Sequence, residues 1–328
     1  MTSYRVLVVT NLWPYEGDRS YGCFVHAQME SLKPLGVEFD VLFINGRESR
    51  WNYARAVGEL RRRLRANHYD IIHAHHVLAG CVARCQFLAP VVVTFHGNDV
   101  LGKARRSGSI TLLGHLFRML SFLLARLVPA IIVQSQEMKA KLRLNHAYVI
   151  PCGIDLELFQ PMERNEARRR LGLDTQRKFV LFPYDRGRVE KRYDLVEAAV
   201  IRARQQVPEI EILEVSGVPP GRMPLYMNAA DILVLTSMIE GSPVAVKEAM
   251  ATNLPVVTVD VGDAAELIGP TEGNYLVPRD VEAIAAKIVD VCRRGTRACS
   301  REWIAQLSME RVAKQILAVY ARVVRRPR

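Results

Sequence analysis

Two glutamates stand around a predicted helix start in the stretch DILVLTSMIEGSPVAVKEAMATNLPVV, residues 231–257. The apolar run Ile232–Thr236 is predicted to be a buried strand, and the loop after it carries Glu240. A helix is expected over Val244–Ala251, with Glu248 inside it, about two turns beyond Glu240. Two acids at this spacing can hold two hydroxyl-bearing parts of one ligand. The simpler alternative is a pair of solvated acids near a helix start.

The expected start of this helix also suits an anion. Ser242 fits the N-cap position, and Pro243 fits the first helical position. Backbone N–H groups and the positive end of the helix dipole together bind phosphate at such a terminus. Because proline has no N–H, Val244 and Ala245 supply the remaining donors. The stretch therefore predicts a diphosphate site next to two hydroxyl-binding acids.

A cluster of cations follows another predicted strand, in VLFPYDRGRVEKRYDL, residues 180–195. Arg186 and Lys191 are five residues apart, and Arg188 and Arg192 lie beside them. A guanidinium can grip a phosphate through two parallel hydrogen bonds, and lysine adds a compact charge. We interpret Arg186 and Lys191 as a diphosphate-binding pair, with Arg188 as the alternative arginine. An ordinary basic loop remains the competing interpretation.

Histidines mark the ends of two predicted strands nearer the N-terminus. His96 and Asp99 follow Val91–Phe95 in VVVTFHGNDV, where a functional histidine is favoured over one that merely ends a strand. The segment YDIIHAHH ends in three histidines, of which His73 and His75 share one face of a strand. A metal site is an alternative there, but no third ligand is evident, and we prefer an interpretation without metal.

Short β-branched runs alternate with longer amphipathic stretches along the whole chain, which predicts parallel sheets covered by helices on both faces. We expect an α/β fold of two Rossmann-like domains that face each other across a cleft: residues 1–160 and residues 161–307, with a helix over 308–328 that can pack back on the first domain. Strands are expected in the first half at 5–10, 38–43, 70–73, 91–95, 130–134 and 148–150, and in the second at 178–183, 209–215, 232–236, 255–259 and 275–277. Neither GxGxxG nor GxxxxGK[ST] follows a strand, which argues against dinucleotide enzymes and P-loop NTPases.

Composition narrows the class of protein further. The 328 residues are 49% apolar and 24% charged, which excludes a disordered or fibrous chain, and the net charge of +11 favours an anionic ligand or surface. Six cysteines without a CxxC pair suggest a reduced, cytoplasmic protein. The N-terminal MTSYRVLVVT is expected to be a strand rather than a signal peptide, and no run of about 18 apolar residues predicts a membrane span.

Taken together, these motifs resemble those of the retaining family 4 glycosyltransferases, which have the GT-B fold. EGSPVAVKE resembles the family's E-x7-E motif, and the resemblance implies that Glu240 contacts the donor sugar and Glu248 the nucleotide ribose. It also implies that Gly241, Ser242, Val244 and Ala245 lie along the sugar and phosphates. The segment with Arg186 and Lys191 resembles the family's diphosphate-binding loop.

The first half carries further resemblance to this family. HGND resembles its HGxD segment, which implies that His96 contacts the donor sugar or stabilises positive charge at its anomeric carbon, with Asp99 on the acceptor side. SYGCFVHAQMESL resembles its glycine loop, in which Gly22 would approach the diphosphate. His75 or His76 would line the acceptor side. The combination of motifs is similar to a subgroup for bacterial surface polysaccharides of the teichuronic-acid type.

The resemblance implies a metal-independent retaining transfer of a sugar from a UDP-, GDP- or ADP-sugar to a hydroxyl of a lipid-linked or saccharide acceptor, without a cofactor. Two alternatives stay open: a non-catalytic basic module that binds nucleic acid or an anionic polymer, and a GT-B sugar-nucleotide epimerase. The chain lacks the aromatic–basic interleaving of single-strand binders, so no nucleic-acid partner is expected.

The segment KARRSGSITLLGHLFRMLSFLLAR, residues 103–126, has five arginines or lysines and no acid. Such a helix can lie at a membrane interface, but we prefer the alternative of a helix buried against the sheet. Lys103, Arg105 and Arg106 in the preceding loop are expected as contacts to anionic lipid. The expected location is cytoplasmic, and the alternative is peripheral attachment to the inner face of the plasma membrane.

Overall fold

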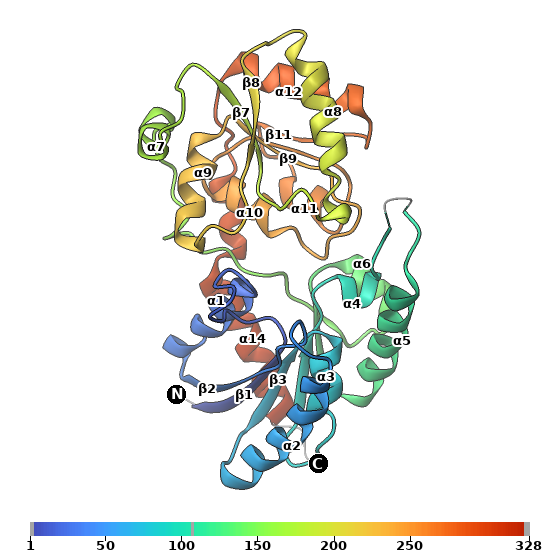
Figure 1. Ribbon diagram of the computed structural model, residues 1–328. Coiled ribbons are helices and arrows are strands. Elements are labelled where there is room, and N and C mark those ends of the chain that lie inside the picture. Colours follow the sequence, from blue (N-terminus) through green and yellow to red (C-terminus); the bar gives the residue numbers. More distant parts are fainter. Residues whose placement is uncertain (1–2, 106–107, 325–328) are drawn as a thin grey trace. The chain divides into compact units, whose positions relative to one another are not determined.

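The computed structural model of the chain describes residues 3–105 and 108–324 (Figure 1). Contacts divide the chain into two units, each built around its own parallel sheet. Unit 1 takes residues 1–103, 110–153 and 309–328, and unit 2 takes residues 104–109 and 154–308. Among the described residues, no helix is both long and apolar enough to cross a membrane.

The sheet of unit 1 has six parallel strands in the order β2-β1-β3-β4-β5-β6. Its strands are short runs of buried, mostly β-branched residues, as expected for a sheet covered on both faces. The strands are β1 (Tyr4–Thr10), β2 (Val37–Phe43), β3 (Ile71–His75), β4 (Val91–Thr94), β5 (Ala130–Val133) and β6 (Tyr148–Val149). The helices are α1 (Cys23–Glu30), α2 (Trp51–Ala66), α3 (Val77–Ala83), α4 (Asn98–Leu101), α5 (Leu112–Leu127), α6 (Gln136–Leu142) and α14 (Met309–Val324), with a 3-10 turn η1 at Lys33–Leu35.

The C-terminal helix α14 completes the core of unit 1. Its buried face, which includes Val312, Ile316 and Tyr320, packs in one apolar cluster with Val6 and Val92 of the sheet. On the opposite face of the sheet, a Cβ at Gly80 of α3 would meet side-chain atoms of the neighbouring β4 and α5. The N-terminal strand β1 and the C-terminal helix α14 therefore belong to one core, with helices on both faces of the sheet.

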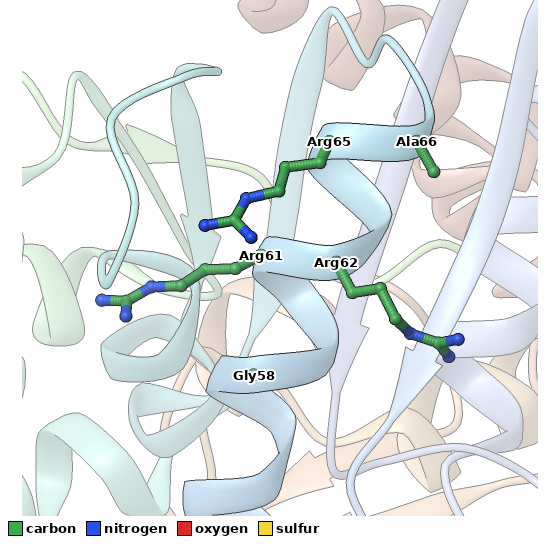
Figure 2. A pocket seen from close by; sticks show the side chains of 5 residues that line it. All are labelled: Gly58, Arg61, Arg62, Arg65 and Ala66. Carbon is green, nitrogen blue, oxygen red and sulfur yellow. The ribbon is translucent and has the colours of Figure 1, made fainter.

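The surface of α2 carries a shallow basic hollow (Figure 2). Arg61 and Arg65 point away from the helix on one side and Arg62 on another, and the lining also includes Gly58 and Ala66. None of the residues predicted for the functional site lines this hollow.

The sheet of unit 2 has five parallel strands in the order β11-β10-β9-β7-β8. The strands are β7 (Lys178–Phe182), β8 (Ile210–Glu214), β9 (Ile232–Leu235), β10 (Val256–Thr258) and β11 (Asn274–Leu276). Between them lie α7 (Arg164–Leu171), α8 (Tyr193–Arg204), α9 (Met223–Ala229), α10 (Val244–Ala251), α11 (Ala264–Ile268), α12 (Val281–Arg294), α13 (Arg301–Ile304) and 3-10 turns η2 (Val189–Lys191), η3 (Pro220–Arg222) and η4 (Ala305–Leu307).

Two apolar clusters cover the two faces of this sheet. Alternate residues of β7 and β9 enter different clusters, because successive side chains of a strand point to opposite faces. One cluster contains the buried side of α10, and the other contains the buried sides of α8 and α12. The position of α10 in its cluster fixes where that helix begins relative to the end of β9.

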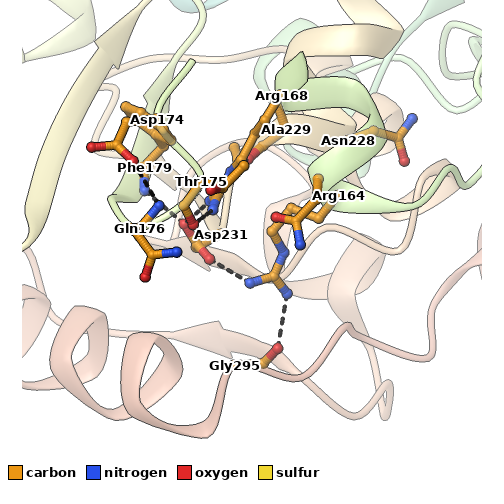
Figure 3. A network of polar contacts seen from close by, with 12 residues as sticks. Arg164, Arg168, Asp174, Thr175, Gln176, Phe179, Asn228, Ala229, Asp231 and Gly295 are labelled. Carbon is orange, nitrogen blue, oxygen red and sulfur yellow. Dashed lines mark hydrogen bonds and ion pairs between the residues drawn. The ribbon is translucent and has the colours of Figure 1, made fainter. Parts of the chain in front are cut away.

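A buried ion-pair network anchors the beginning of β9 (Figure 3). Asp231 accepts from Arg164 at 2.5 Å and from Arg168 at 2.6 Å, and the backbone N–H of Phe179 donates to the same carboxylate. Arg168 also donates to the carbonyl oxygen of Ala229 at 2.9 Å. Since every oxygen of this carboxylate has a partner, the network ties β9, β7 and α7 together at the edge opposite the predicted site.

The change from unit 1 to unit 2 falls between Gly153 and Ile154, earlier than the expected boundary at residue 160. Ile154 and Phe159 are buried in a core cluster of unit 2, and this packing draws the segment into that unit. The short segment Ala104–Ser109 also groups with unit 2.

Candidate functional site

The loop after β9 is tied to the turn after β7. The hydroxyl of Thr236 donates to the carbonyl oxygens of Lys191 and Arg192, both at 3.1 Å, and the N–H of Met238 donates to the carbonyl oxygen of Glu190 at 2.8 Å. These bonds join two segments that are more than forty residues apart and adjacent in the sheet. These hydrogen bonds fix the position of the turn that carries Lys191 relative to the loop that carries Glu240.

Lys191 and Glu240 form a close ion pair in this position. The Lys191 ammonium lies 2.5 Å from a Glu240 carboxylate oxygen, and both side chains are largely buried. The same ammonium lies 4.0 Å from the ring centre of Tyr184, and burial, with the nearby carboxylates of Glu240 and Glu248, raises the pKa of the Tyr184 hydroxyl well above its ordinary value. The predicted lysine and both predicted glutamates therefore gather around one tyrosine.

Glu248 lies within α10 and is partly buried. Burial raises the pKa of its carboxyl from 4.5 to about 8, so the group is largely protonated at neutral pH. A protonated carboxyl both donates and accepts a hydrogen bond, whereas a carboxylate only accepts. The two glutamates consequently differ: Glu240 is paired with a cation, and Glu248 is held by burial in its neutral form.

The helix α10 begins at Val244, as expected, but its cap differs from the prediction. Pro243, and not Ser242, occupies the N-cap position, and no side chain caps the helix. The Ser242 hydroxyl instead donates to the carboxylate of Asp263 at 2.5 Å. Val244 and Ala245 occupy the first two helical positions, where backbone N–H groups have no acceptor within the helix.

The loop after β10 supports the same site from the other side. Gly262 has a φ of +61°, and a Cβ there would lie 2.8 Å from the carbonyl oxygen of Glu240 and 3.0 Å from that of Gly241. Burial raises the pKa of the neighbouring Asp263 to about 6, against the opposing effects of Lys247 and the Ser242 hydroxyl. A glycine is required where the two loops touch backbone to backbone.

The two candidate arginines have different surroundings. Arg186 is exposed, and its guanidinium lies 3.8 Å from Glu214. Arg188 is bound to Glu190 at 2.7 Å, and its guanidinium lies 5.9 Å from the ring centre of Tyr184. Both side chains are on the turn that leads to Lys191.

In unit 1, histidines gather at the ends of β3 and β4. The ring nitrogens His75 Nδ1 and His96 Nε2 are 3.1 Å apart, and the two rings are stacked with a centre-to-centre distance of 5.3 Å. Burial lowers the pKa of His96 to about 3, with smaller effects from His76 and His73, and burial also lowers the pKa of His75. Both rings are therefore neutral, and one of the two facing nitrogens carries the proton and donates it to the other.

Both ring nitrogens of His73 form hydrogen bonds to hydroxyl groups within unit 1. Its Nδ1 bonds to the hydroxyl of Tyr320 at 2.6 Å and its Nε2 to the hydroxyl of Thr94 at 2.8 Å. Burial lowers the pKa of His73 to about 3. The ring centres of His73 and His75 are 4.2 Å apart, so Tyr320 of α14 helps to position the histidine that bonds His96.

Asp99 organises the loop that carries His96. Its fully buried carboxylate accepts from the backbone N–H groups of His96, Gly97 and Val100 at 3.0–3.1 Å. Burial raises its pKa. The prediction placed Asp99 on the acceptor side; the structure directs its oxygens to backbone instead.

His76 and Gly22 lie at the same edge of unit 1. His76 has a left-handed φ of 79°, and its ring nitrogen accepts from the N–H of Leu78 at the start of α3. Gly22, at the N-cap of α1, has a φ of 67°, and a Cβ there would overlap the backbone of Leu12 and Trp13. Phe24, two residues on, contacts the His96 ring edge-on at 5.1 Å. The glycine loop thus approaches His96 within unit 1.

Several positioning residues escaped prediction. Tyr184 lies within a quoted motif, where an aromatic residue between strand and cations was the available signal. Other positioning residues contact partners that are distant in sequence, so no local sequence pattern predicts them: Thr236, Gly262, Asp263 and Tyr320. Within the residues that the structure describes, no three metal-binding side chains come together.

Comparison with protein families gives two matches. Residues 3–158 match the model of Glycosyltransferase Family 4, and residues 190–294 match that of Glycosyl transferases group 1. The two matches fall on the N-terminal half and on the part of unit 2 that contains Lys191, Glu240 and Glu248.

Several glycosyltransferases are similar in sequence to much of this chain. TuaC of Bacillus subtilis (strain 168), named for teichuronic acid biosynthesis, is 30% identical over 241 residues, which are 67% of this chain and 60% of TuaC. A D-inositol 3-phosphate glycosyltransferase of a Nocardioides species is 25% identical over 336 residues, covering 82% of this chain and 71% of that one. LpsB of Rhizobium meliloti, a lipopolysaccharide core biosynthesis mannosyltransferase, is 29% identical over 242 residues, 62% and 68% of the two chains. The match to TuaC thus spans less than two thirds of that relative.

Solved structures share the fold. A sucrose-phosphate synthase from Thermosynechococcus elongatus superimposes with a TM-score of 0.76 at 20% identity, over 98% of this chain and 99% of that one. Alr3699/HepE of Anabaena, in a complex with UDP and glucose, gives a TM-score of 0.72 at 17% identity, over 97% and 100% of the two chains. The expected fold of two parallel sheets with flanking helices is confirmed. With both family matches and these relatives, the chain belongs to family 4 of the GT-B glycosyltransferases.

Proposed function

We propose that this protein is a retaining glycosyltransferase that moves a sugar from a nucleoside diphosphate sugar to a hydroxyl group. The observation that carries the proposal is that Lys191, Glu240 and Glu248, the last of them on α10, lie near Tyr184 in unit 2. This arrangement combines a cation, free helix N–H groups and two acids of different protonation within one unit. Those are the groups that a diphosphate flanked by two sugars requires.

Each group has an assigned part in donor binding. Lys191, with Arg186 or Arg188, neutralises the diphosphate together with the N–H groups of Val244 and Ala245. Glu240 orients the transferred sugar. Glu248 binds the ribose hydroxyls. The relatives support a sugar nucleotide as donor, since HepE was solved with UDP and with UDP-glucose. UDP-, GDP- and ADP-sugars are the candidates for this chain.

In the proposed reaction, the bond from the anomeric carbon to the diphosphate oxygen breaks, and both of its electrons leave with the diphosphate. The acceptor oxygen bonds to the same face of that carbon, and its proton passes to a phosphate oxygen of the leaving group. Positive charge develops at the anomeric carbon and negative charge on the diphosphate. Lys191 and the start of α10 stabilise the negative charge, so the proposal uses no metal. In unit 1, neutral His96 is assigned to the sugar, with His75 fixing which of its nitrogens carries the proton.

The acceptor is proposed to be a lipid-linked or polysaccharide precursor in the synthesis of a cell-surface glycan. The names of TuaC and LpsB, which concern teichuronic acid and lipopolysaccharide core, support this class. Such an acceptor places the enzyme on the inner face of the plasma membrane. Lys103 lies in unit 1 and Arg105 in unit 2, and both are exposed; Arg106 lies outside the described residues.

The test begins with a thermal-shift screen of UDP-, GDP- and ADP-sugars, followed by release of nucleotide from the best donor with and without acceptor. Wild-type protein is expected to bind one nucleotide class and to need an acceptor for turnover. Lys191→Ala should remove most turnover, whereas Arg177→Ala, an exposed cation on unit 2, should leave it unchanged. Turnover without acceptor that yields an isomeric sugar nucleotide would favour an epimerase. Salt-sensitive binding of nucleic acid without affinity for any sugar nucleotide would overturn the proposal.

A further inference from the structure

Helix α5 of unit 1 exposes its apolar side. Leu112 is 83% exposed and Met119 53% exposed, and both lie on one stripe of the helix. The remaining large apolar side chains exposed on this helix are Leu113, Leu116, Leu123 and Leu127. The expectation of a helix buried against the sheet is therefore wrong for this face, which the sheet does not cover.

The inward side of α5 consists mostly of small residues, together with the buried Leu124. Gly114, Ser121 and Ala125 are buried, and the hydroxyl of Ser121 donates to the carbonyl oxygen of Asp99 at 2.8 Å. A Cβ at Gly114 would lie 2.5 Å from the backbone nitrogen of Lys103. This close packing fixes which side of the helix faces outward. The outward leucines therefore hold a fixed position on the surface, and they do not contribute to the packing of the core.

The apolar surface continues onto the loop after α3. Phe87 is 80% exposed and Leu88 is also exposed. The guanidinium of Arg84 lies 4.3 Å from the ring centre of Phe87 and donates to the carbonyl oxygen of Leu127 at 2.9 Å. The end of α5 and the aromatic loop are therefore neighbours. We call the exposed apolar residues of α5 together with Phe87 and Leu88 the α5 surface.

Positive charge surrounds the α5 surface. From Ile71 to Gln136 the sequence has six arginines or lysines and one acid, and that acid is the fully buried Asp99. Arg126 lies on the exposed side of α5, stacked on the ring of Phe122 at 3.4 Å. Next to α3, Arg61 of α2 donates to the carbonyl oxygen of Cys85 at 3.3 Å. The basic hollow of α2 (Figure 2) is therefore close to the same loop.

We infer that the α5 surface binds an anionic lipid bilayer, with the leucines and Phe87 in the interfacial region and the arginines at the headgroups. Exposed apolar residues between cations are the pattern of an interfacial helix. A second copy of the chain fits less well. A two-fold dimer would place the same surface on both sides, and arginines would then face arginines with no exposed acid from this segment between them. The inference deepens the proposed function, on which it rests for the membrane-bound acceptor, by naming the surface that holds the enzyme there.

The experiment measures binding of the full chain to vesicles of phosphatidylcholine with and without phosphatidylglycerol, by flotation. Wild-type protein should bind the anionic vesicles, and added salt should weaken but not abolish binding. Leu116→Gln and Leu123→Gln should each lower the partition coefficient about tenfold, because each removes an inserted leucine without a change of charge. Arg126→Gln should lower it about fivefold. Ile201→Gln, an equally exposed apolar residue on unit 2, is the matched control and should bind as wild type does.

The outcomes separate this inference from the proposed function. Each variant is also tested for thermal unfolding and for binding of the donor nucleotide in the absence of lipid, both of which should match wild type. Nucleotide binding with no vesicle binding would overturn the inference and leave the proposed function standing; vesicle binding without nucleotide binding would do the reverse. A wild-type dimer in analytical ultracentrifugation that Leu116→Gln converts to a monomer would assign the surface to a second copy and overturn the inference.

Discussion

Replacing Glu248 by glutamine should stabilise the protein and weaken donor binding at the same time. Burial raises the pKa of this carboxyl from 4.5 to about 8 in the folded protein. Between these two pH values the folded state keeps a proton that the unfolded state releases, so the free energy of unfolding falls as pH rises through this window. The penalty is absent below pH 4.5 and complete above pH 8.

The magnitude follows from this shift. A change of the Glu248 pKa from 4.5 to about 8 corresponds to about 5 kcal/mol of unfolding free energy. Glutamine resembles the neutral acid at every pH, so it avoids the cost of ionising this buried group. Glu248→Gln should therefore gain several kcal/mol over wild type near pH 9, up to about 5 kcal/mol, and nothing near pH 4.

Donor binding should respond in the opposite direction. If the Glu248 carboxylate accepts the ribose hydroxyls, binding must release its proton, and the nucleotide Kd should fall up to about tenfold per pH unit until pH 8. Glu248→Gln loses hydrogen bonds to a charged group, which corresponds to about 10- to 100-fold weaker binding near pH 8.5, and its Kd should no longer depend on pH in this way.

The assay combines urea unfolding from pH 4 to 9 with calorimetric titration of the nucleotide in two buffers of different ionisation enthalpy, which counts the released proton. Glu209→Gln is the control, because that glutamate is exposed and lies outside the site. A glutamine variant that is less stable than wild type near pH 9 would refute the assigned protonation. A variant that binds nucleotide as wild type does would refute the assigned contact.

Three further predictions test the groups that position the site. Lys191→Ala leaves the carboxylate of Glu240 unpaired and should lower the unfolding free energy by about 3 kcal/mol. The double variant with Glu240→Gln should recover this stability but not the turnover. Recovered turnover would contradict the role assigned to Lys191. Gly262→Ala should lower stability by about 1–3 kcal/mol and weaken nucleotide binding, because its methyl group would push on the Glu240 loop; unchanged affinity in a calorimetric titration would show that the loop adapts. Burial lowers the pKa of His73 to about 3, so as pH falls from 6.5 towards 3 the unfolded state binds a proton that the folded state does not, and the unfolding free energy decreases. His73→Gln should therefore reduce the slope of unfolding free energy against pH between pH 5 and 6 by up to about 1.4 kcal/mol per pH unit. An unchanged slope would disprove a neutral, buried His73.

The strand pattern was predictable because buried parallel strands are continuous apolar runs. Ile232–Leu235 and Val91–Thr94 differ from their expected bounds by one residue at the C-terminal end. Short helices were less visible. The helix α9, Met223–Ala229, begins with a proline at its first turn and has only seven residues, so its apolar periodicity is too brief to recognise.

The face of α5 shows a second limit of sequence patterns. Periodicity indicates that a helix has an apolar stripe, but it does not say whether the stripe meets a sheet or solvent. In α5 the small residues Gly114 and Ser121 face inward, because close approach to neighbouring backbone requires them there. Leu124 is buried on the same side, whereas Leu112, Leu113, Leu116, Leu123 and Leu127 remain exposed. The need for small side chains at these backbone contacts, and not the apolar stripe alone, sets the orientation of the helix. That need follows only from the three-dimensional neighbours.

Strand order explains why the motifs could be predicted and their partners could not. In unit 2 the strands β10, β9 and β7 are adjacent, so the loops that follow them bring Gly262, Glu240 and Lys191 to one edge of the sheet. In unit 1 the adjacent strands β3 and β4 likewise bring His75 and His96 together. Each motif is a strand with the loop after it, which a sequence displays directly. Which loops become neighbours depends on the crossovers between strands, and that is why the ties between loops required the structure.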